Sequence, residues 1–269
     1  MLRRTGPFLG ISAAAAIWLV PVVVLALVAV RDIADFSRYG ALALPHMLRW
    51  ANFADAWDQG VSTYLLNSII ITAVKVPAGI VIESLAAFAL VFLPLPARSL
   101  ILGFFLLGLI VPIQMTLVPL TILMKHLSLI DTRFGLFIIY VGFGIPFGIL
   151  VMRGFFRRIP KEVVEAALID GCSWFTIYAR IILPLAKPAI ASLLILDGIA
   201  TWNEFILAQI FLHSESVRTL PLGLIHFSTE YAIQYDQVAA AVLIGIVPIM
   251  MVYLFFQRYF VSGLAGAVK

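Results

Sequence analysis

Long apolar runs separated by short polar stretches dominate the chain, and they predict helices that span a membrane. A helix needs roughly 17–25 apolar residues to cross a hydrocarbon core about 30 Å thick, and each run reaches that length. The runs are continuously apolar, without the alternation of barrel strands. We therefore expect an all-α integral membrane protein with six transmembrane helices. They lie at Phe8–Val30, Leu65–Leu93, Ser99–Met124, Phe134–Met152, Pro188–Leu212 and Val238–Phe260.

Prolines interrupt several of these runs. In a membrane bundle, neighbouring helices can satisfy the backbone groups that a proline frees, so we expect kinks and not breaks. No loop is long enough to form a domain of its own, so residues 1–269 are expected to form a single transmembrane domain. The prolines concerned are Pro112, Pro119, Pro146 and Pro248.

Basic residues are unevenly distributed between the connecting segments. Eleven lie at the two termini, in the Pro94–Arg98 turn and in the segment 153–187, six lie in the other connections, and Lys75 lies within a span. Because cytoplasmic loops carry the excess of Lys and Arg, both termini are expected in the cytoplasm. Arg3 and Arg4 precede the first run as in a signal peptide, but the run is longer than a cleaved signal, which indicates a retained helix. The outer segments are then Arg31–Tyr64, Lys125–Arg133 and His213–Gln237.

Composition supports the membrane class. Apolar residues make up 63% of the chain and charged residues 12%, whereas soluble domains have about 45–50% and about 25%. A soluble globule this apolar would expose large apolar patches, which excludes a soluble enzyme. The single cysteine, Cys172, excludes an internal disulfide framework. The net charge of +4 is explained by membrane orientation, so no nucleic-acid partner is expected.

Sequence signatures of catalysis are absent. None of the five lysines follows a glycine, so the chain has no P-loop, and it contains neither an H-E-x-x-H pair nor a G-x-S-x-G elbow. We expect no enzymatic activity, and neither a cofactor nor a metal bound by this chain.

The longest polar segment on the expected cytoplasmic side lies between the fourth and fifth spans. Pro160 suits the start of a helix and Gly171 the left-handed residue after its end, so a helix is predicted over Pro160–Asp170. Ser173 can cap a second helix, which we expect to end at Pro184.

One face of this predicted helix is apolar. Two alanines keep the helix thin, so it can lie in a groove of another protein. The six basic residues of the loop equally favour a helix lying on lipid headgroups, and helix physics alone leaves both interpretations open. The apolar face consists of Val163, Val164, Ala167 and Leu168.

The same loop resembles the EAA signature of ABC-importer permease subunits, without a gap in the spacing. Further features resemble the sugar-uptake branch, in particular the maltose-transporter-type inner permease, over nearly the whole chain. They are Tyr64-Leu-Leu-Asn67-Ser68, Asp170 before the motif glycine, Trp202-Asn203-Glu204-Phe205 and the tail Gln257–Lys269. The signature itself consists of Glu165, Ala166, Ala167, Gly171, Ile181, Leu183 and Pro184.

The resemblance implies a cytoplasmic coupling helix in the loop 153–187 of an inner-membrane permease surrounded by membrane lipid. It implies a second homologous permease, two ATP-binding cassette subunits that bind ATP and Mg, and an extracytoplasmic sugar-binding protein. It also implies that Ala167→Arg leaves insertion intact but uncouples sugar uptake from ATP hydrolysis. The first outer loop departs from the family by its charge, with Asp32, Asp35, Asp55 and Asp58. The residues implied to couple to the ATPases are Glu165, Ala166, Ala167, Asp170, Gly171, Ile181, Leu183 and Pro184.

Ionisable residues within spans are costly and usually face a bundle interior or water. Asp197 and Glu204 lie seven residues apart, about two turns, so they share a helix face. With Trp202 and Asn203 they are candidates to line a sugar path. Alternatively, Asp197 anchors helix packing and Glu204 lies near the outer membrane surface. Lys75 and Glu83 can pair with each other or across helices.

Two other functions stay open from the sequence. One is the same permease class carrying glycerol phosphate or another small solute, although Lys75 is the single basic residue well inside a span. The other is a stand-alone secondary transporter that relays protons through its intramembrane carboxylates.

Overall fold

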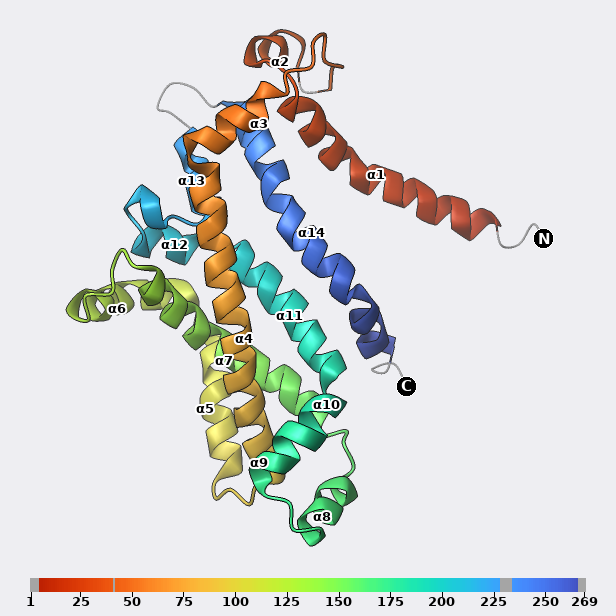
Figure 1. Ribbon diagram of the computed structural model, residues 1–269, viewed down its shortest axis with the longest axis vertical. Helices are drawn as coiled ribbons and strands as arrows, with labels where there is room; N and C mark the ends of the chain where they lie inside the picture. The colour runs from red at the N-terminus through yellow and green to blue at the C-terminus, as the bar shows by residue number, and fades with distance from the viewer. Residues whose placement is uncertain (1–4, 41, 228–233, 266–269) are drawn as a thin grey trace. The chain divides into compact units, whose positions relative to one another are not determined.

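The computed structural model describes residues 5–40, 42–227 and 234–265, and every regular element in these ranges is helical (Figure 1). The all-α class is therefore confirmed. The chain divides into two compact units, Met1–Leu65 with Gly223–Val247, and Leu66–Leu222 with Pro248–Lys269.

The first unit contains the N-terminal helices and the beginnings of two long ones. Its helices are α1 (Thr5–Ala29), α2 (Ile33–Tyr39), α3 (Ala51–Ala56), a π-helical turn (Trp57–Val61), a 3-10 turn (Leu224–Phe227), and the starts of α4 (Ser62–Phe92) and α14 (Tyr235–Ala265).

Gly60 allows the sharp turn that leads into α4. Its φ of +109° is a conformation that side chains with a Cβ rarely adopt. The ring of Tyr64 packs against Gly60 and also against Gly223, where a Cβ would overlap the ring. The two glycines therefore make room for the aromatic side chain at the start of α4.

The second unit contains the remaining helices. They are α5 (Arg98–Ile110), α6 (Ile113–His126), α7 (Arg133–Phe156), α8 (Lys161–Ile169), α9 (Trp174–Thr176), a π-helical turn (Ile177–Ile182), α10 (Leu183–Leu185), α11 (Lys187–Trp202), α12 (Ile206–Phe211), a 3-10 turn (Glu215–Val217) and α13 (Leu220–Gly223), which ends at the unit boundary.

Four helices among the described residues are long and apolar enough to span a membrane: Gly10–Ala29, Ala51–Phe92, Arg133–Phe156 and Tyr235–Gln257. Two bent helix pairs raise the number to as many as six, if each pair is one span. These pairs are Arg98–Ile110 with Ile113–His126, and Trp174–Leu185 with Lys187–Trp202. A multi-pass membrane fold is confirmed, and the count of six stays a prediction.

The expectation of kinks is wrong at Pro112. The two helices on either side of it differ in direction by 99°. Val111 is extended, with ψ at 116°, because a residue before proline is pushed out of the helical region. Pro119, Pro146 and Pro248 do lie inside helices, as expected.

Two further boundaries differ from the sequence prediction. The predicted span Pro188–Leu212 is interrupted after Trp202, and α12 begins only at Ile206. The helix that Ser173 caps does not end at Pro184 but continues to Leu185 and bends there by 74°. The π-helical turn just before Pro184 is an adjustment by which a helix accommodates the missing N–H of a proline.

The described residues of the second unit form two centres of apolar packing. One joins α4, α7, α8 and α11, and includes Val76, Phe88, Met152, Val164, Ala167, Ile177 and Leu193. The other joins α4, α6, α7 and α12, and includes Ile71, Met124, Leu136, Ile139 and Leu207. The first centre holds α8 against the bundle.

Candidate functional site

The helix predicted over Pro160–Asp170 is present as α8, with Pro160 and Asp170 as its two flanking residues. The amide of Gly171 donates to the carbonyl of Leu168, and the amide of Cys172 to that of Ala167, both at 3.0 Å. This is the Schellman arrangement, and Gly171 takes the left-handed conformation as predicted, with φ at +81°. The end of α8 is therefore fixed by local hydrogen bonds.

A second cap starts the segment after α8. The amide of Thr176 donates to Oγ of Ser173 at 3.2 Å, as the sequence predicts. Further along, the hydroxyls of Tyr178 and Ser84 are hydrogen-bonded at 2.8 Å, which ties this segment to α4. Of the three last residues of the EAA signature, Ile181 and Leu183 are half-buried and Pro184 is exposed.

Two residues of the predicted apolar face of α8 pack into its own bundle, whereas Val163 is half-buried and Leu168 is 38% exposed. Val164 and Ala167 are 5% and 6% exposed and belong to the core that joins α8 to α4 and α7. An arginine at position 167 would have to be accommodated in this packing, and the expected effect of Ala167→Arg stays a prediction. The outward side carries Glu162, Ala166 and Ile169, and Ile169 is 86% exposed.

The buried charges of the spans meet between α4 and α11. Lys75 forms an ion pair with Asp197 across the two helices, which is one of the two pairings the sequence allows. Glu83 is also buried, and its Oε2 has no hydrogen-bond partner among the described residues. A Cβ at Gly148 of α7 would overlap Glu83, so this glycine makes room for the carboxyl group.

Glu204 caps the short helix α12. Its carboxylate accepts from the amides of Leu207 and Ala208 at 2.8 and 3.1 Å, and from the hydroxyl of Tyr140 at 2.5 Å. Such a cap satisfies the free amides at a helix start and explains why the helix restarts after Trp202. The sequence does not point to Tyr140, because its partner is 64 residues away.

Asp197 and Glu204 line one cavity of about 250 Å³, but they do not share a helix face, because α11 ends at Trp202 and Glu204 follows it. Lys75, Tyr140 and Thr201 contribute the other polar groups of its wall. The two remaining path candidates lie elsewhere. Trp202 lines a separate apolar cavity of about 230 Å³, and Asn203 is exposed, with its amide donating to the carbonyl of Ile199 at 3.0 Å.

The motif at the start of the second span holds an outer segment. The buried amide of Asn67 donates to the carbonyls of Ser216 and Arg218 at 2.9 and 2.8 Å. Oγ of Ser68 accepts from the amide of Leu220 at 2.8 Å. The segment 213–220 is thus pinned to the first turns of α4.

Asp131 holds the same segment from another side. Its carboxylate accepts from the amides of His213 and Ser214 at 2.8 and 2.9 Å, and from the hydroxyl of Ser214 at 2.5 Å. Burial opposes ionisation, but the hydrogen bonds from Ser214 and His213 outweigh it and lower the pKa of Asp131 below its usual value.

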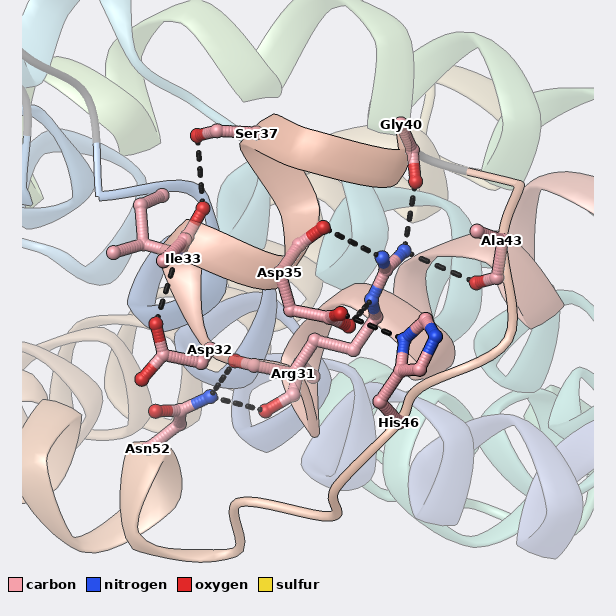
Figure 2. A network of polar contacts seen from close by, with 11 residues as sticks. Arg31, Asp32, Ile33, Asp35, Ser37, Gly40, Ala43, His46 and Asn52 are labelled. Atoms are coloured by element: carbon pink, nitrogen blue, oxygen red, sulfur yellow. Dashed lines mark hydrogen bonds and ion pairs between the residues drawn. The ribbon is translucent and has the colours of Figure 1, made fainter.

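Most charges of the first outer loop are paired within the loop, and Figure 2 shows the network around Arg31 and Asp35. Arg31 is fully buried and donates to Oδ2 of Asp35 and to the carbonyl of Gly40, both at 2.7 Å. The hydrogen bond from Arg31 lowers the pKa of Asp35. Arg49 pairs with Asp32 and Asp55 at 3.0 and 3.2 Å. Three of the four carboxylates that depart from the family pattern therefore organise the loop itself.

Some residues on which the sequence predictions rest lie outside the residues that the structure describes. The tail Gln257–Lys269 is helical up to Ala265, and residues 266–269 are not described. Arg3, Arg4 and Lys269, which contribute to the predicted orientation, are likewise outside the described ranges.

Comparison with known proteins identifies the family to which the chain is similar. The family "Binding-protein-dependent transport system inner membrane component" matches residues 76–266. The chain is 37% identical over 228 residues to the "Probable ABC transporter permease protein YurM" of Bacillus subtilis, covering 84% of this chain and 76% of the relative. It is 32% identical over 280 residues to the "Arabinooligosaccharides transport system permease protein AraQ" of Halalkalibacterium halodurans, covering 100% of both.

A further relative and one solved structure are also similar to this chain. The chain is 33% identical over 230 residues to the "Diacetylchitobiose uptake system permease protein NgcG" of Streptomyces coelicolor, covering 84% of this chain and 75% of the relative. One chain of a bacterial ABC transporter "involved in the import of the acidic polysaccharide alginate" shares the fold, with a TM-score of 0.81 and 24% identity. That match covers 96% of this chain and 98% of the other.

Proposed function

The chain belongs to the family of inner membrane components of binding-protein-dependent transport systems, and we propose that it forms half of the pathway for a sugar in an ATP-driven importer. A second homologous permease forms the other half, and an extracytoplasmic binding protein delivers the sugar. Two ATP-binding cassette subunits bind ATP and Mg²⁺ and dock at the loop 153–187. The family is one of transport subunits and not of enzymes.

The observation that carries this proposal is the two-sided character of α8. Its inner side is anchored through Val164 and Ala167, whereas Glu162, Ala166 and Ile169 face outward. An exposed apolar side chain next to small and acidic ones is typical of a helix that docks in a partner's groove. We therefore assign Ala166, and not Ala167, to the ATPase contact, with Glu165 at its edge.

The anchoring of α8 supports transmission of force. The Schellman end at Gly171 and the packing of Ala167 make α8 continuous with the core of α4 and α7. A rigid-body displacement of α8 by the ATPases then moves the helices that line the cavity. Rigid-body rocking of domains is a common way in which closure at one site, here the ATPases, opens a second site, here the cavity. In this proposal Asp170, Ile181, Leu183 and Pro184 shape the loop and do not contact nucleotide.

A neutral sugar fits the cavity better than a phosphate ester. Among the described residues that line the cavity, Lys75 is the one basic residue, and Asp197 already neutralises it. Asp197 and Glu204 supply oxygens that accept from hydroxyl groups, whereas a dianion would need uncompensated cations. The arabinooligosaccharides and diacetylchitobiose in the names of two relatives are also carbohydrates.

The proposed orientation places α8 and both termini in the cytoplasm, since the basic residues accumulate on that side. A stand-alone secondary transporter is not supported, because the family works with a binding protein. The permease class with another small solute is the second candidate, and uptake assays with labelled solutes distinguish it.

Cross-linking tests the docking of α8. In a Cys172→Ser background, Ala166→Cys should cross-link to a co-expressed ATPase subunit, and Ser37→Cys in the outer loop should not. Ala166→Arg should abolish sugar-stimulated ATP hydrolysis and uptake in proteoliposomes while the four-subunit complex retains its melting temperature. Normal uptake by Ala166→Arg, or no cross-link at position 166 in an active transporter, would refute the proposal.

A further inference from the structure

A cavity of about 350 Å³ lies between the end of α4, the start of α5 and one side of α8. We name it the basic pocket. Phe92 and Leu93 form an apolar part of its wall, and Trp174 adds an aromatic ring. Arg98, Lys161 and Glu165 supply its charged groups. The pocket wall thus combines apolar and aromatic side chains with two cations and one carboxylate.

Positive charge around the basic pocket is in excess. Arg98 and Lys161 line it, and Arg153 lies within electrostatic range of both Arg98 and Arg157. No carboxylate among the described residues is within ion-pair distance of these cations, and Arg98 donates only to the carbonyl of Leu93, at 2.5 Å. Nε of Arg153 is buried without a hydrogen-bond partner among the described residues. Glu165 is the one carboxylate among the described residues of the pocket wall, so the cations around the pocket exceed it and leave a net positive charge.

We propose that the basic pocket binds the phosphate of an anionic lipid headgroup. The pocket lies where α4 ends, at Phe92, and Arg153 and Arg157 lie where α7 ends, at Phe156. Helix ends are where a chain leaves the hydrocarbon core, and Trp and basic residues at this depth meet headgroups. A guanidinium and an ammonium can hold phosphate oxygens, while Phe92 and Leu93 contact the first carbons of the acyl chains.

The geometry of α8 favours a lipid over an acidic group of the ATPase. Lys161, Val164, Glu165 and Leu168 follow the i, i+3, i+4, i+7 spacing of one helix face and line the pocket. The outward residues Glu162, Ala166 and Ile169 lie on another face. A lipid in the pocket and a protein on the outward face can therefore bind α8 together. The lipid would link α8 to the start of α5, so that membrane composition influences the position of α8.

The test compares lipid retention by the purified transporter complex. The complex is reconstituted into nanodiscs of phosphatidylcholine with phosphatidylglycerol, and native mass spectrometry measures the bound phosphatidylglycerol. Lys161→Gln and Arg98→Gln should each reduce its retention about fivefold. Arg180→Gln is the matched control, because Arg180 is an exposed cation of the same loop outside the pocket. Arg98→Lys keeps the charge and should retain most of the lipid.

A second measurement separates the sources of phosphate. Inorganic phosphate added to complex in phosphatidylcholine alone should not raise the melting temperature, whereas phosphatidylglycerol should raise it in the wild type but not in Lys161→Gln. A shift with inorganic phosphate alone would assign the pocket to a free anion and overturn the lipid proposal. Unchanged lipid retention in both Gln variants would also overturn the lipid proposal. So would a Lys161→Gln complex that loses its ATPase subunits but still retains the lipid. None of these results depends on the Ala166 cross-link.

Discussion

Lys75 on α4 and Asp197 on α11 form a buried ion pair although 122 residues separate them in the chain. Their side chains are 3% and 10% exposed. The pair joins the second span to the helix that follows the EAA loop, and both residues line the cavity assigned to the sugar. It thus links helix packing to the wall of the proposed pathway.

Removing one member of this pair should destabilise the bundle. Lys75→Met leaves the carboxylate of Asp197 buried without compensation, which is expected to lower the free energy of unfolding by about 3–5 kcal/mol. The double variant Lys75→Met with Asp197→Leu should recover most of the loss, because apolar packing replaces both charges. Chemical denaturation in detergent measures the free energy of unfolding of the single and the double variant.

Lys125→Met is the control for this prediction, because Lys125 is exposed at the end of α6. Its unfolding free energy should stay close to that of the wild type. Equal stability of Lys75→Met and Lys125→Met would show that the ion pair does not hold the bundle together.

Gly148 should not tolerate a methyl group. A Cβ at this position overlaps the buried side chain of Glu83, so Gly148→Ala forces a rearrangement that we expect to cost about 1–3 kcal/mol. Gly142→Ala, on the same helix, meets nothing within 4 Å and should be neutral or slightly stabilising. Melting temperatures of the two variants compare the sites, and a Gly148→Ala protein as stable as Gly142→Ala would contradict the contact with Glu83.

Asn67 should matter for the outer segment that it holds. Asn67→Ala leaves the carbonyls of Ser216 and Arg218 without their donor, which is expected to cost about 1–3 kcal/mol. Hydrogen exchange should increase over residues 213–220. Asn203→Ala, which loses one bond to the adjacent turn of α11, should leave this segment protected. Unchanged exchange in Asn67→Ala would mean that other contacts hold the segment.

Asp131 should make the same segment sensitive to strong acid. Because its folded-state pKa lies below the usual value of about 3.9, the ionised carboxylate stabilises the fold above that pH, and this contribution is lost as pH falls through the folded pKa. The melting-temperature difference between wild type and Asp131→Asn should therefore be constant from neutral pH to about pH 5 and shrink below about pH 4.

Asp58→Asn is the comparison for this titration, since Asp58 is an exposed carboxylate of the first outer loop. It should change the melting temperature little over the same range. A difference for Asp131→Asn that does not depend on pH would show that its charge is not what the segment 213–220 binds.

Local patterns in the sequence determined the membrane class and the form of α8. A long apolar run favours a helix in lipid wherever its neighbours lie, because the backbone bonds are satisfied within the segment. Pro160, Gly171 and Ser173 act on the few residues around them, so the limits of α8 and the cap of the following helix were predictable. The EAA spacing likewise indicated the family from residues within one loop.

Only the tertiary structure decided which side of α8 is free, which carboxylate Lys75 meets and where the fifth apolar run is interrupted. Each depends on residues far away in the chain: Ala167 is buried by α4 and α7, Lys75 pairs with Asp197, and Glu204 binds Tyr140. The sequence restricts a buried charge to a partner of opposite sign, but several carboxylates meet that condition. Packing selects one of them, because desolvated charges must pair with whatever group the neighbouring helix presents.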